Sequence, residues 1–286
     1  MLPDYRDVHM LLPAYAMTDG AGVRLKRSLG SAELEYLDPF LMLDEFKSDD
    51  SRDYAGGFPD HPHRGFETVT YMLAGEFEHK DHLGNHGVLK PGSVQWMTAG
   101  RGIVHSEMPL TTSGLVWGFQ MWVNLPQTDK MCLPRYQDIE AEQIPEVLRE
   151  DGTLVRVIAG RAFGSTGPVN GIAVDPTLLD VRIPAGVTMD LPLPVGHNAF
   201  VYAYEGRGAV GGDRKEVGIP IGSGMVAVLE DGDTVRLKAG EQGLKLIVGA
   251  GRSLGEPVAR LGPFVMNTRE EVMRAVDDFN RGTFLG

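Results

Sequence analysis

Residues 61–109 read HPHRGFETVTYMLAGEFEHKDHLGNHGVLKPGSVQWMTAGRGIVHSEMP, and short apolar segments alternate in this stretch with turn signals. The turn signals are Ala74-Gly75, Gly84-Asn85, Pro91-Gly92 and Ala99-Gly100. Such spacing is typical of short strands joined by tight turns in a barrel or a sandwich. Glycine supplies 37 of the 286 residues, about 13% against a usual share of roughly 7%. We therefore predict an all-β fold.

The same pattern returns in the second half of the chain as an internal repeat. The run YMLAG at 71–75 resembles the run YAYEG at 202–206. Gly92 follows the first run after 17 residues, and Gly224 follows the second after 18. Matches in the same order and at the same spacing indicate two copies of one supersecondary unit. The sequence thus predicts two similar β-barrels.

A polar, carboxylate-rich segment from Gln137 to Asp151 has the composition of a linker. It divides the chain into two predicted domains, residues 1–137 and residues 138–286. The second domain is expected to close with a short helix that begins with a capping box of Thr268 and Glu271. The remaining helix signals are one apolar face and a stop, formed by Val272, Val276, Phe279 and Gly282. We predict a packing role for this helix.

The charge balance of the chain is acidic. It has 27 lysines and arginines against 39 aspartates and glutamates, a net charge of −12. A surface that binds DNA unaided usually needs a basic patch to displace counterions from phosphates. The densest basic stretch holds only Arg24, Lys26 and Arg27, which we interpret as a solvated strand face. We expect no direct nucleic-acid partner.

The single cysteine, Cys132, excludes an intrachain disulfide and favours a reducing compartment. The N-terminus, MLPDYRDVHM, lacks the basic start and apolar core of a signal peptide. No run approaches the ~20 apolar residues that span a bilayer. We therefore expect a cytoplasmic protein with no membrane partner. No base stands beside Cys132 in the sequence, which argues against a thiolate nucleophile.

Two short motifs place metal-binding side chains at alternate positions. His61 and His63 form one pair, and His105 with Glu107 forms another about forty residues later. Residues i and i+2 of a strand project to the same side, so two such strands can converge four ligands. Three imidazoles and a carboxylate suit a borderline divalent ion such as Fe, Ni, Cu, Zn or Mn. The alternative is that these histidines are solvated turn residues.

Glu67 competes with Glu107 as the carboxylate of this site. It has the same parity as His61 and His63, so on a regular strand it would face the same side. It could be a ligand, a partner that orients an imidazole, or the end of a hydrogen-bonded turn. We favour Glu107 as the ligand because it is paired with His105.

The other histidines give weaker signals. His79, His82 and His86 surround a Gly-Asn turn, and we interpret them as solvated residues of a hairpin tip rather than as a second metal site. The repeat places His105 on Leu237 and Glu107 on Ala239, so we expect no metal in the second barrel. His197 falls opposite Phe66 and is expected to be a structural hydrogen-bonding residue.

Six stretches closely resemble the pirin family of bicupins. They are DPFLMLDEF at 38–46, HPHRGFETVTY at 61–71, QWMTAGRGIVHSEMP at 95–109, PRYQ at 134–137, GHNAF at 196–200 and GPFVMN at 262–267. The resemblance covers nearly the whole chain, and the 15-residue block at 95–109 is highly specific. His82 departs from the family pattern, which has a small or uncharged residue there.

The resemblance implies two cupin β-barrels with a metal ion, usually iron, in the N-terminal one only. The family's ligands match His61, His63, His105 and Glu107 position by position. Several members show quercetin 2,3-dioxygenase activity, and others are described as metal-dependent regulators that act through protein partners. The first role implies a flavonol-like substrate, with Glu107 taking its hydroxyl proton. The second implies a metal- or redox-sensing protein without turnover.

Overall fold

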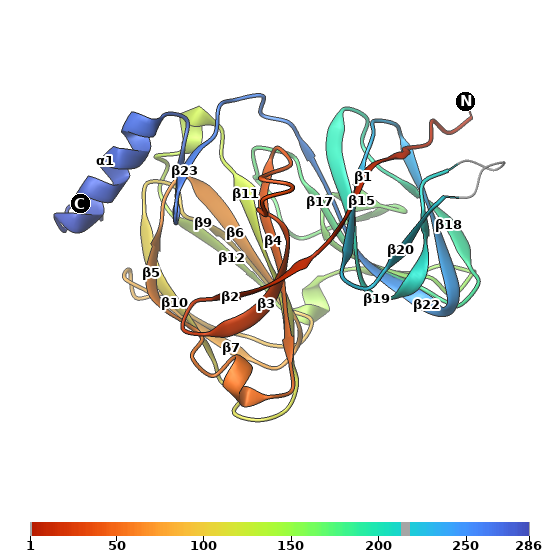
Figure 1. The fold of residues 1–286 in the computed structure, drawn as a ribbon, viewed down its shortest axis with the longest axis horizontal. Coiled ribbons are helices and arrows are strands. Elements are labelled where there is room, and N and C mark those ends of the chain that lie inside the picture. The colour runs from red at the N-terminus through yellow and green to blue at the C-terminus, as the bar shows by residue number, and fades with distance from the viewer. Residues whose placement is uncertain (1, 213–217, 286) are drawn as a thin grey trace. The chain divides into compact units, whose positions relative to one another are not determined.

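The computed structural model describes residues 2–212 and 218–285, and strands dominate this part of the chain (Figure 1). Its contacts divide the chain into two compact units. The first barrel comprises Ala16–Gly30, Phe40–Ala141 and Leu254–Gly286. The second barrel comprises Met1–Tyr15, Ser31–Pro39 and Glu142–Ser253. The predicted all-β fold with two barrels and a short C-terminal helix is confirmed.

Each unit is assembled from three segments, whereas the sequence predicts one boundary between residues 137 and 138. Strand β1 (Val8–Pro13) pairs with β21 (Met225–Leu229) and thus belongs to the second barrel. Helix α1 (Arg269–Asn280) belongs to the first barrel. Turn signals show where strands end, but strand partners far apart in the chain depend on complementary sheet edges, which no local pattern encodes.

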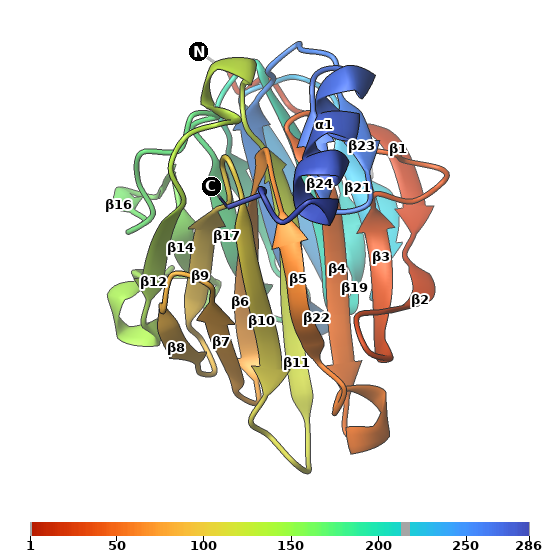
Figure 2. The same cartoon turned by 90° about the vertical axis from the view of Figure 1, so that its left-hand side faces the viewer.

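Two sheets form the wall of the first barrel, and a separate two-stranded sheet is formed by residues 259–266. One has the order β12-β9-β6-β11-β4-β3-β2, and the other has the order β5-β10-β7-β8, whose strands lie side by side in Figure 2. The strands of this barrel are β2 (Tyr15–Asp19), β3 (Val23–Leu29), β4 (Phe40–Ser48), β5 (Phe58–His63), β6 (Phe66–Ala74), β7 (Phe77–Asp81), β8 (His86–Leu89), β9 (Val94–Thr98), β10 (Ile103–Pro109), β11 (Val116–Asn124), β12 (Arg135–Ile139), β23 (Ala259–Leu261) and β24 (Phe264–Met266). Short 3₁₀ turns are η1 (Ser51–Asp53), η2 (Gln127–Asp129) and, at the linker, η3 (Ala141–Gln143).

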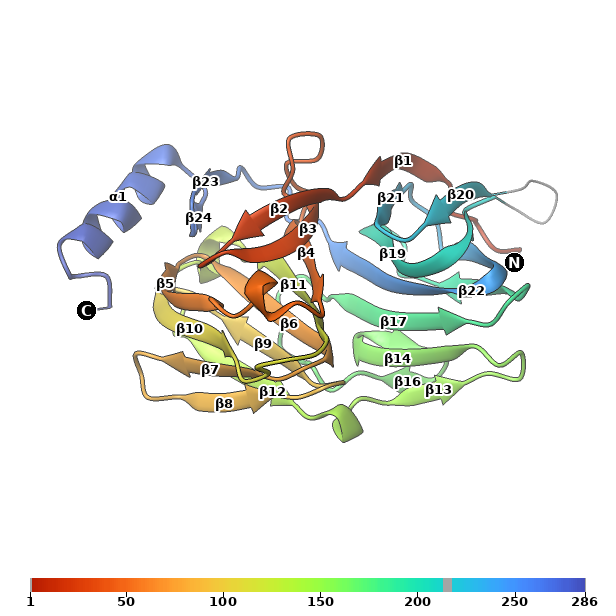
Figure 3. The ribbon, with the colours of Figure 1, turned by 60° about the horizontal axis from the view of Figure 1, so that its bottom comes forward.

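One large sheet forms most of the second barrel. Its order is β1-β21-β19-β22-β17-β14-β13 (Figure 3). In addition, β18 pairs with β22 and β20 pairs with β19. Besides β1 and β21, the strands are β13 (Glu146–Leu148), β14 (Leu154–Ala159), β15 (Arg161–Ala162), β16 (Ser165–Thr166), β17 (Thr177–Ile183), β18 (Thr188–Pro192), β19 (His197–Val210), β20 (Ile219–Gly222) and β22 (Thr234–Arg252).

The predicted repeat is visible as identical turns in the two barrels. The amide of Gly92 donates a hydrogen bond to the carbonyl of Met72, and the amide of Gly224 donates one to Ala203, each at 2.7 Å. Gly92 and Gly224 also have similar left-handed φ values of 87° and 80°. The spacing found in the sequence therefore corresponds to equivalent strand–turn geometry.

The two barrels differ in what fills them. The second barrel is packed with buried Val, Leu, Ile and Ala side chains. Leu237 and Ala239, which the repeat aligns with His105 and Glu107, belong to this aliphatic cluster. Aliphatic side chains have no lone pair to offer a metal ion, so the interior of this barrel has no metal-binding chemistry at the aligned positions.

Helix α1 packs on the first barrel. Thr268 and Glu271 form both hydrogen bonds of the predicted capping box. Val272 is buried with Phe264, Met266 and neighbouring apolar residues, which explains why the helix belongs to this unit. In the described part of the chain, no helix is long and apolar enough to cross a membrane.

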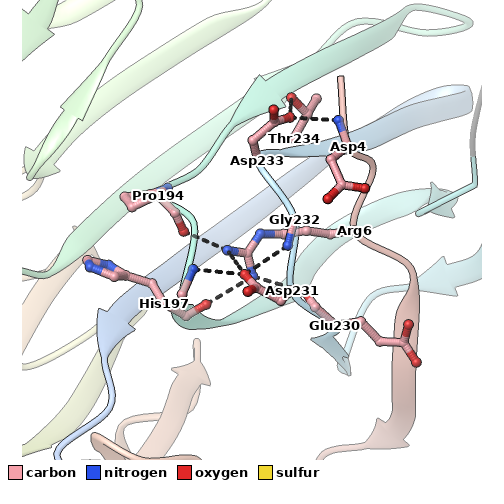
Figure 4. Close-up of polar contacts among 10 residues, drawn as sticks. Asp4, Arg6, Pro194, His197, Glu230, Asp231, Gly232, Asp233 and Thr234 are labelled. Carbon is pink, nitrogen blue, oxygen red and sulfur yellow. Dashed lines mark hydrogen bonds and ion pairs between the residues drawn. The ribbon is translucent and has the colours of Figure 1, made fainter. Parts of the chain in front are cut away.

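Arg6 attaches the N-terminal segment to the second barrel, as Figure 4 shows. Its side chain is fully buried, and its guanidinium donates to the carbonyl oxygens of Pro194, His197 and Glu230 at 2.6–2.9 Å. Asp231 adds an ion pair at 3.3 Å, but that carboxylate is mostly exposed, so the pair contributes little. Arg6 therefore holds the N-terminal segment mainly through its hydrogen bonds to these three carbonyl oxygens.

We predict that Arg6→Ala lowers the free energy of unfolding of this barrel by about 3 kcal/mol, since it leaves buried carbonyl oxygens without donors. Urea unfolding checks the value. Asp231→Asn is the control, because an amide oxygen can still accept the bonds that Gly196 and Gly232 donate. Equal stability of the Arg6→Ala variant and the wild type would refute the structural role.

Candidate metal centre

Three imidazoles converge inside the first barrel. Strands β5 and β10 are antiparallel neighbours, with His61 opposite His105 and His63 opposite Ile103. One ring nitrogen from each histidine lies within 4.8 Å of the other two. The ring centroids are 4.4–5.0 Å apart. The structure therefore brings together three of the four predicted ligands, His61, His63 and His105.

The ring nitrogens of His63 and His105 lack protein partners that would explain their burial. Neither nitrogen of His63 or His105 has a hydrogen bond, although both side chains are almost completely buried. Burial, with smaller effects from the neighbouring imidazoles, lowers the pKa of both residues well below the usual value, so both are neutral near pH 7. Buried polar atoms are normally hydrogen-bonded. A divalent metal ion would bind the lone-pair nitrogen of each neutral ring, and the donor set fits such an ion.

His61 is held in a suitable tautomer. Its Nδ1 lies 2.8 Å from the carbonyl oxygen of Pro59, to which it can only donate. The proton is thereby placed on Nδ1, and the Nε2 lone pair remains for a metal ion.

The chain bend after His63 is fixed by several contacts within the first barrel. Gly65 has φ of 88°, and a Cβ there would approach the carbonyl oxygen of Val265 to 1.9 Å, so only glycine fits. The buried ammonium of Lys130 donates to the carbonyls of Gly65 and Val265 and to Asn124. Burial lowers the pKa of Lys130 to about 8. These contacts position the end of β5 and its histidines.

Glu107 faces the barrel interior but lies outside the group of three imidazoles. Its two carboxylate oxygens accept hydrogen bonds from Thr70 Oγ1 at 2.9 Å and Gln120 Nε2 at 2.7 Å. Each oxygen keeps a further lone pair, because a carboxylate has about four acceptor positions. The role of Glu107 as the fourth ligand stays a prediction.

A row of polar side chains crosses the seven-stranded sheet of the first barrel. Register partners on adjacent strands project from the same face. In strand order β3, β4, β11, β6, β9 and β12, the row consists of Arg27, Asp44, Gln120, Thr70, Gln95 and Asp138. Two of its members, Thr70 and Gln120, donate hydrogen bonds to Glu107, so the row positions this carboxylate within the barrel. The second barrel has an aliphatic interior instead.

Glu67 lies on the opposite face of β6 from this site. Phe66 packs against His63 and Thr70 donates to Glu107, so the even-numbered residues of β6 face the site. Glu67 is odd-numbered and therefore faces away from it. Glu67 Oε1 instead accepts a hydrogen bond from Thr98 at 2.6 Å. The left-handed bend at Gly65 separates β5 from β6, so Glu67 does not face the side that its parity with His61 and His63 predicts.

His79 was wrongly interpreted as a solvated residue of the hairpin tip. It lies opposite Glu107 on neighbouring strands, is 2% exposed, and neither ring nitrogen has a hydrogen bond. Its ring stacks on Tyr136 at 5.4 Å, and burial lowers its pKa. His86 does lie on the exposed hairpin, where it contacts Glu78. The inward side of β7 could have been found from the alternation of Phe77, His79 and Asp81.

The prediction of a solvated basic face also needs correction. Arg24 and Lys26 are exposed, but Arg27 is 8% exposed and its guanidinium is bound to Asp44. Strand alternation from the buried Val23 places Arg27 on the inner face. Arg27 is therefore a residue of the barrel interior.

A cavity of about 370 Å³ adjoins the imidazoles, within the range of small-molecule sites. His61, His63 and Gln120 form one part of its wall. The remaining lining residues are apolar or aromatic (Met42, Phe58, Pro59, Trp122, Pro263), charged (Asp19, Arg27, Arg260) or glycine (Gly20, Gly262). The cavity thus combines apolar and aromatic surface with two of the three convergent imidazoles.

Comparison with known proteins identifies the family. Residues 22–123 match the pirin family, and residues 178–285 match the pirin C-terminal cupin domain. A pirin-like protein of Caulobacter vibrioides is 49% identical over 282 residues, covering 98% of this chain and 99% of the relative. The chain belongs to the pirin family. The resemblance seen in the sequence is thus confirmed, and the candidate metal centre lies in the first of the two pirin barrels.

Solved structures agree with this assignment. A crystal structure of a quercetin 2,3-dioxygenase from Acinetobacter baumannii is 36% identical with a TM-score of 0.89, covering 99% of both chains. A bacterial pirin from Escherichia coli, solved in complex with nickel(II), is 16% identical with a TM-score of 0.65, covering 85% of this chain and 99% of its own. The second match shows a shared fold.

Proposed function

We propose that this pirin is a metal-dependent dioxygenase, with iron as its metal, that cleaves a flavonol such as quercetin. The observation that carries the proposal is the set of three convergent imidazoles, two of them buried without partners, beside a largely apolar cavity. The 36% identical relative that is named quercetin 2,3-dioxygenase supports the choice of substrate. In this proposal His61, His63 and His105 bind the ion, and Glu107 is the fourth ligand.

When bound, a divalent metal supplies Lewis acidity and a template that brings substrate and O2 together. The chain's own residues supply the rest. Trp122, Phe58 and Met42 offer apolar surface to flat rings and exclude water from them. Glu107, oriented by Thr70 and Gln120, accepts the proton of the flavonol 3-hydroxyl as general base.

The test of this proposal is release of carbon monoxide from quercetin, with matching O2 uptake and loss of the flavonol absorbance. We expect turnover by the iron-loaded wild type and none above background by the metal-free protein or His105→Ala. A loaded wild type that is no faster than these controls would contradict the dioxygenase proposal. The metal-dependent, partner-binding role would then be the better account.

A paired substitution tests the choice of carboxylate. We predict that Glu107→Gln loses metal affinity by at least tenfold, the lower end of the cost of losing even an outer partner of a metal site. Glu67→Gln should retain wild-type metal content, since that residue faces away from the imidazoles and bonds to Thr98. Both variants are loaded identically and measured by elemental analysis. Metal loss confined to the Glu67 variant would reverse the assignment.

A further inference from the structure

We propose that Arg27 is a specificity residue of the cavity beside the three imidazoles, and that it selects aromatic ligands carrying an anionic oxygen substituent. The inference rests on the proposed function, since it assigns the cavity to the substrate. It adds a second recognition point to the one that the metal ligands provide.

The first observation is that Arg27 is held rigidly. It lies on β3 opposite Asp44 of β4, and its side chain is largely buried. Its Nε donates to Asp44 Oδ1 at 2.8 Å and its Nη2 donates to Asp44 Oδ2 at 2.7 Å, a bidentate pair. Nη2 also donates to Asp19 Oδ2 at 3.0 Å. A planar guanidinium fixed in this way is preorganised for binding.

The second observation comes from an inventory of donors. A guanidinium has five N–H groups, and the bonds to Asp44 and Asp19 use the one on Nε and the two on Nη2. The two on Nη1 have no acceptor among the residues that the structure describes. Arg27 lines the cavity. The cavity thus contains a fixed cation with two N–H groups available to a ligand oxygen.

The charges around the cavity favour an anion. Arg260 also lines it, with its guanidinium carbon 4.6 Å from the centre of the Trp122 ring, and Asp19 is the one carboxylate among the lining residues. A divalent ion on the imidazoles and the two arginines together carry four positive charges, which exceed the three negative charges of Asp19, Asp44 and Glu107 by one. An aromatic carboxylate or phenolate would balance this charge while its rings lie on the apolar wall.

The test uses two probes that differ in one group, 3-hydroxyflavone and its 4′-carboxylate derivative, titrated into zinc-loaded protein and followed by flavonol fluorescence. Binding is read without turnover, so the result is independent of whether quercetin is cleaved. We expect the wild type to bind the carboxylate roughly tenfold tighter than the parent, as one charge-assisted hydrogen bond allows.

Arg27→Gln should abolish this preference and change the affinity for the parent probe by less than about twofold. Because Arg27→Gln leaves Asp44 buried without its partner, the double variant Arg27→Gln/Asp44→Asn provides a neutral pair and should give the same result. Arg24→Gln is the matched control, since Arg24 lies on the same strand but is exposed and pairs with Asp53. Metal content is measured in every variant.

An equal preference for the carboxylate in wild type and both Arg27 variants would overturn the proposal. A wild type that binds the two probes equally, or binds neither, would do the same. Failure of quercetin cleavage with the carboxylate preference intact would leave Arg27 as a recognition residue and refute only the dioxygenase activity.

Discussion

His105→Ala is expected to retain less than about a tenth of the wild-type metal content. His105 is 1% exposed, and neither of its ring nitrogens has another partner, so its substitution removes one of three convergent donors. Loss of a partner that only orients a ligand costs roughly 10–100-fold in metal affinity, and loss of a ligand should cost at least as much. The measurement is elemental analysis after loading with one equivalent of iron and removal of free ion.

The control for this experiment is His86→Ala, which also removes one imidazole. His86 is exposed on β8 and contacts Glu78 in the hairpin, away from the three convergent rings. It should keep about one equivalent of iron per chain. Full retention of metal by His105→Ala, or an equal loss in both variants, would show that the ion binds elsewhere.

Glu67→Gln is expected to stabilise the metal-free protein at pH 8.5 and to have little effect at pH 5. Burial raises the pKa of Glu67 to about 7, against an ordinary value of 4.5, although Thr98 donates a hydrogen bond that opposes the change. The folded state therefore prefers the neutral acid. As pH rises from about 4.5 through 7, the wild type loses about 3 kcal/mol that glutamine does not lose.

Urea unfolding of wild type and variant at the two pH values gives this difference directly. Burial also lowers the pKa of His63 and His105, but these residues are common to both proteins, so their contribution to the pH dependence cancels. Glu241→Gln, on the exposed side of β22, should show the same stability difference from wild type at both pH values. A Glu67→Gln effect that does not change between pH 5 and pH 8.5 would mean that Glu67 is ionised in the folded state throughout.

The parts of this structure that local patterns determine were predictable. Glycine at tight turns predicted short strands, and the repeat of YMLAG in YAYEG predicted two equivalent barrels. His61, His63 and His105 converge because their two strands are adjacent, with His61 directly opposite His105, whereas the role of Glu107 stays a prediction. Alternation within single strands brings side chains of two strands to one site only when those strands are neighbours, as β5 and β10 are.

Three sequence expectations differ from the structure, those for Glu67, His79 and Arg27. Glu67 has the parity of His63, but the bend at Gly65, which the close approach of Val265 requires, turns it to the other face. His79 lies near a polar hairpin tip in the sequence, although the alternation of Phe77, His79 and Asp81 indicates that it faces inward. Arg27 lies in a basic run, although alternation from Val23 places it on the inner face, where it binds Asp44. The orientation of Glu67 depends on a long-range contact, whereas those of His79 and Arg27 follow from their own strands.

The most direct test of the central claim is an anomalous difference map from crystals of the iron-loaded protein, recorded on both sides of the iron absorption edge. The account predicts one peak per chain, located between the rings of His61, His63 and His105. A peak at the hairpin histidines, a second peak inside the second barrel, or no peak beside these three rings in fully loaded protein would contradict it.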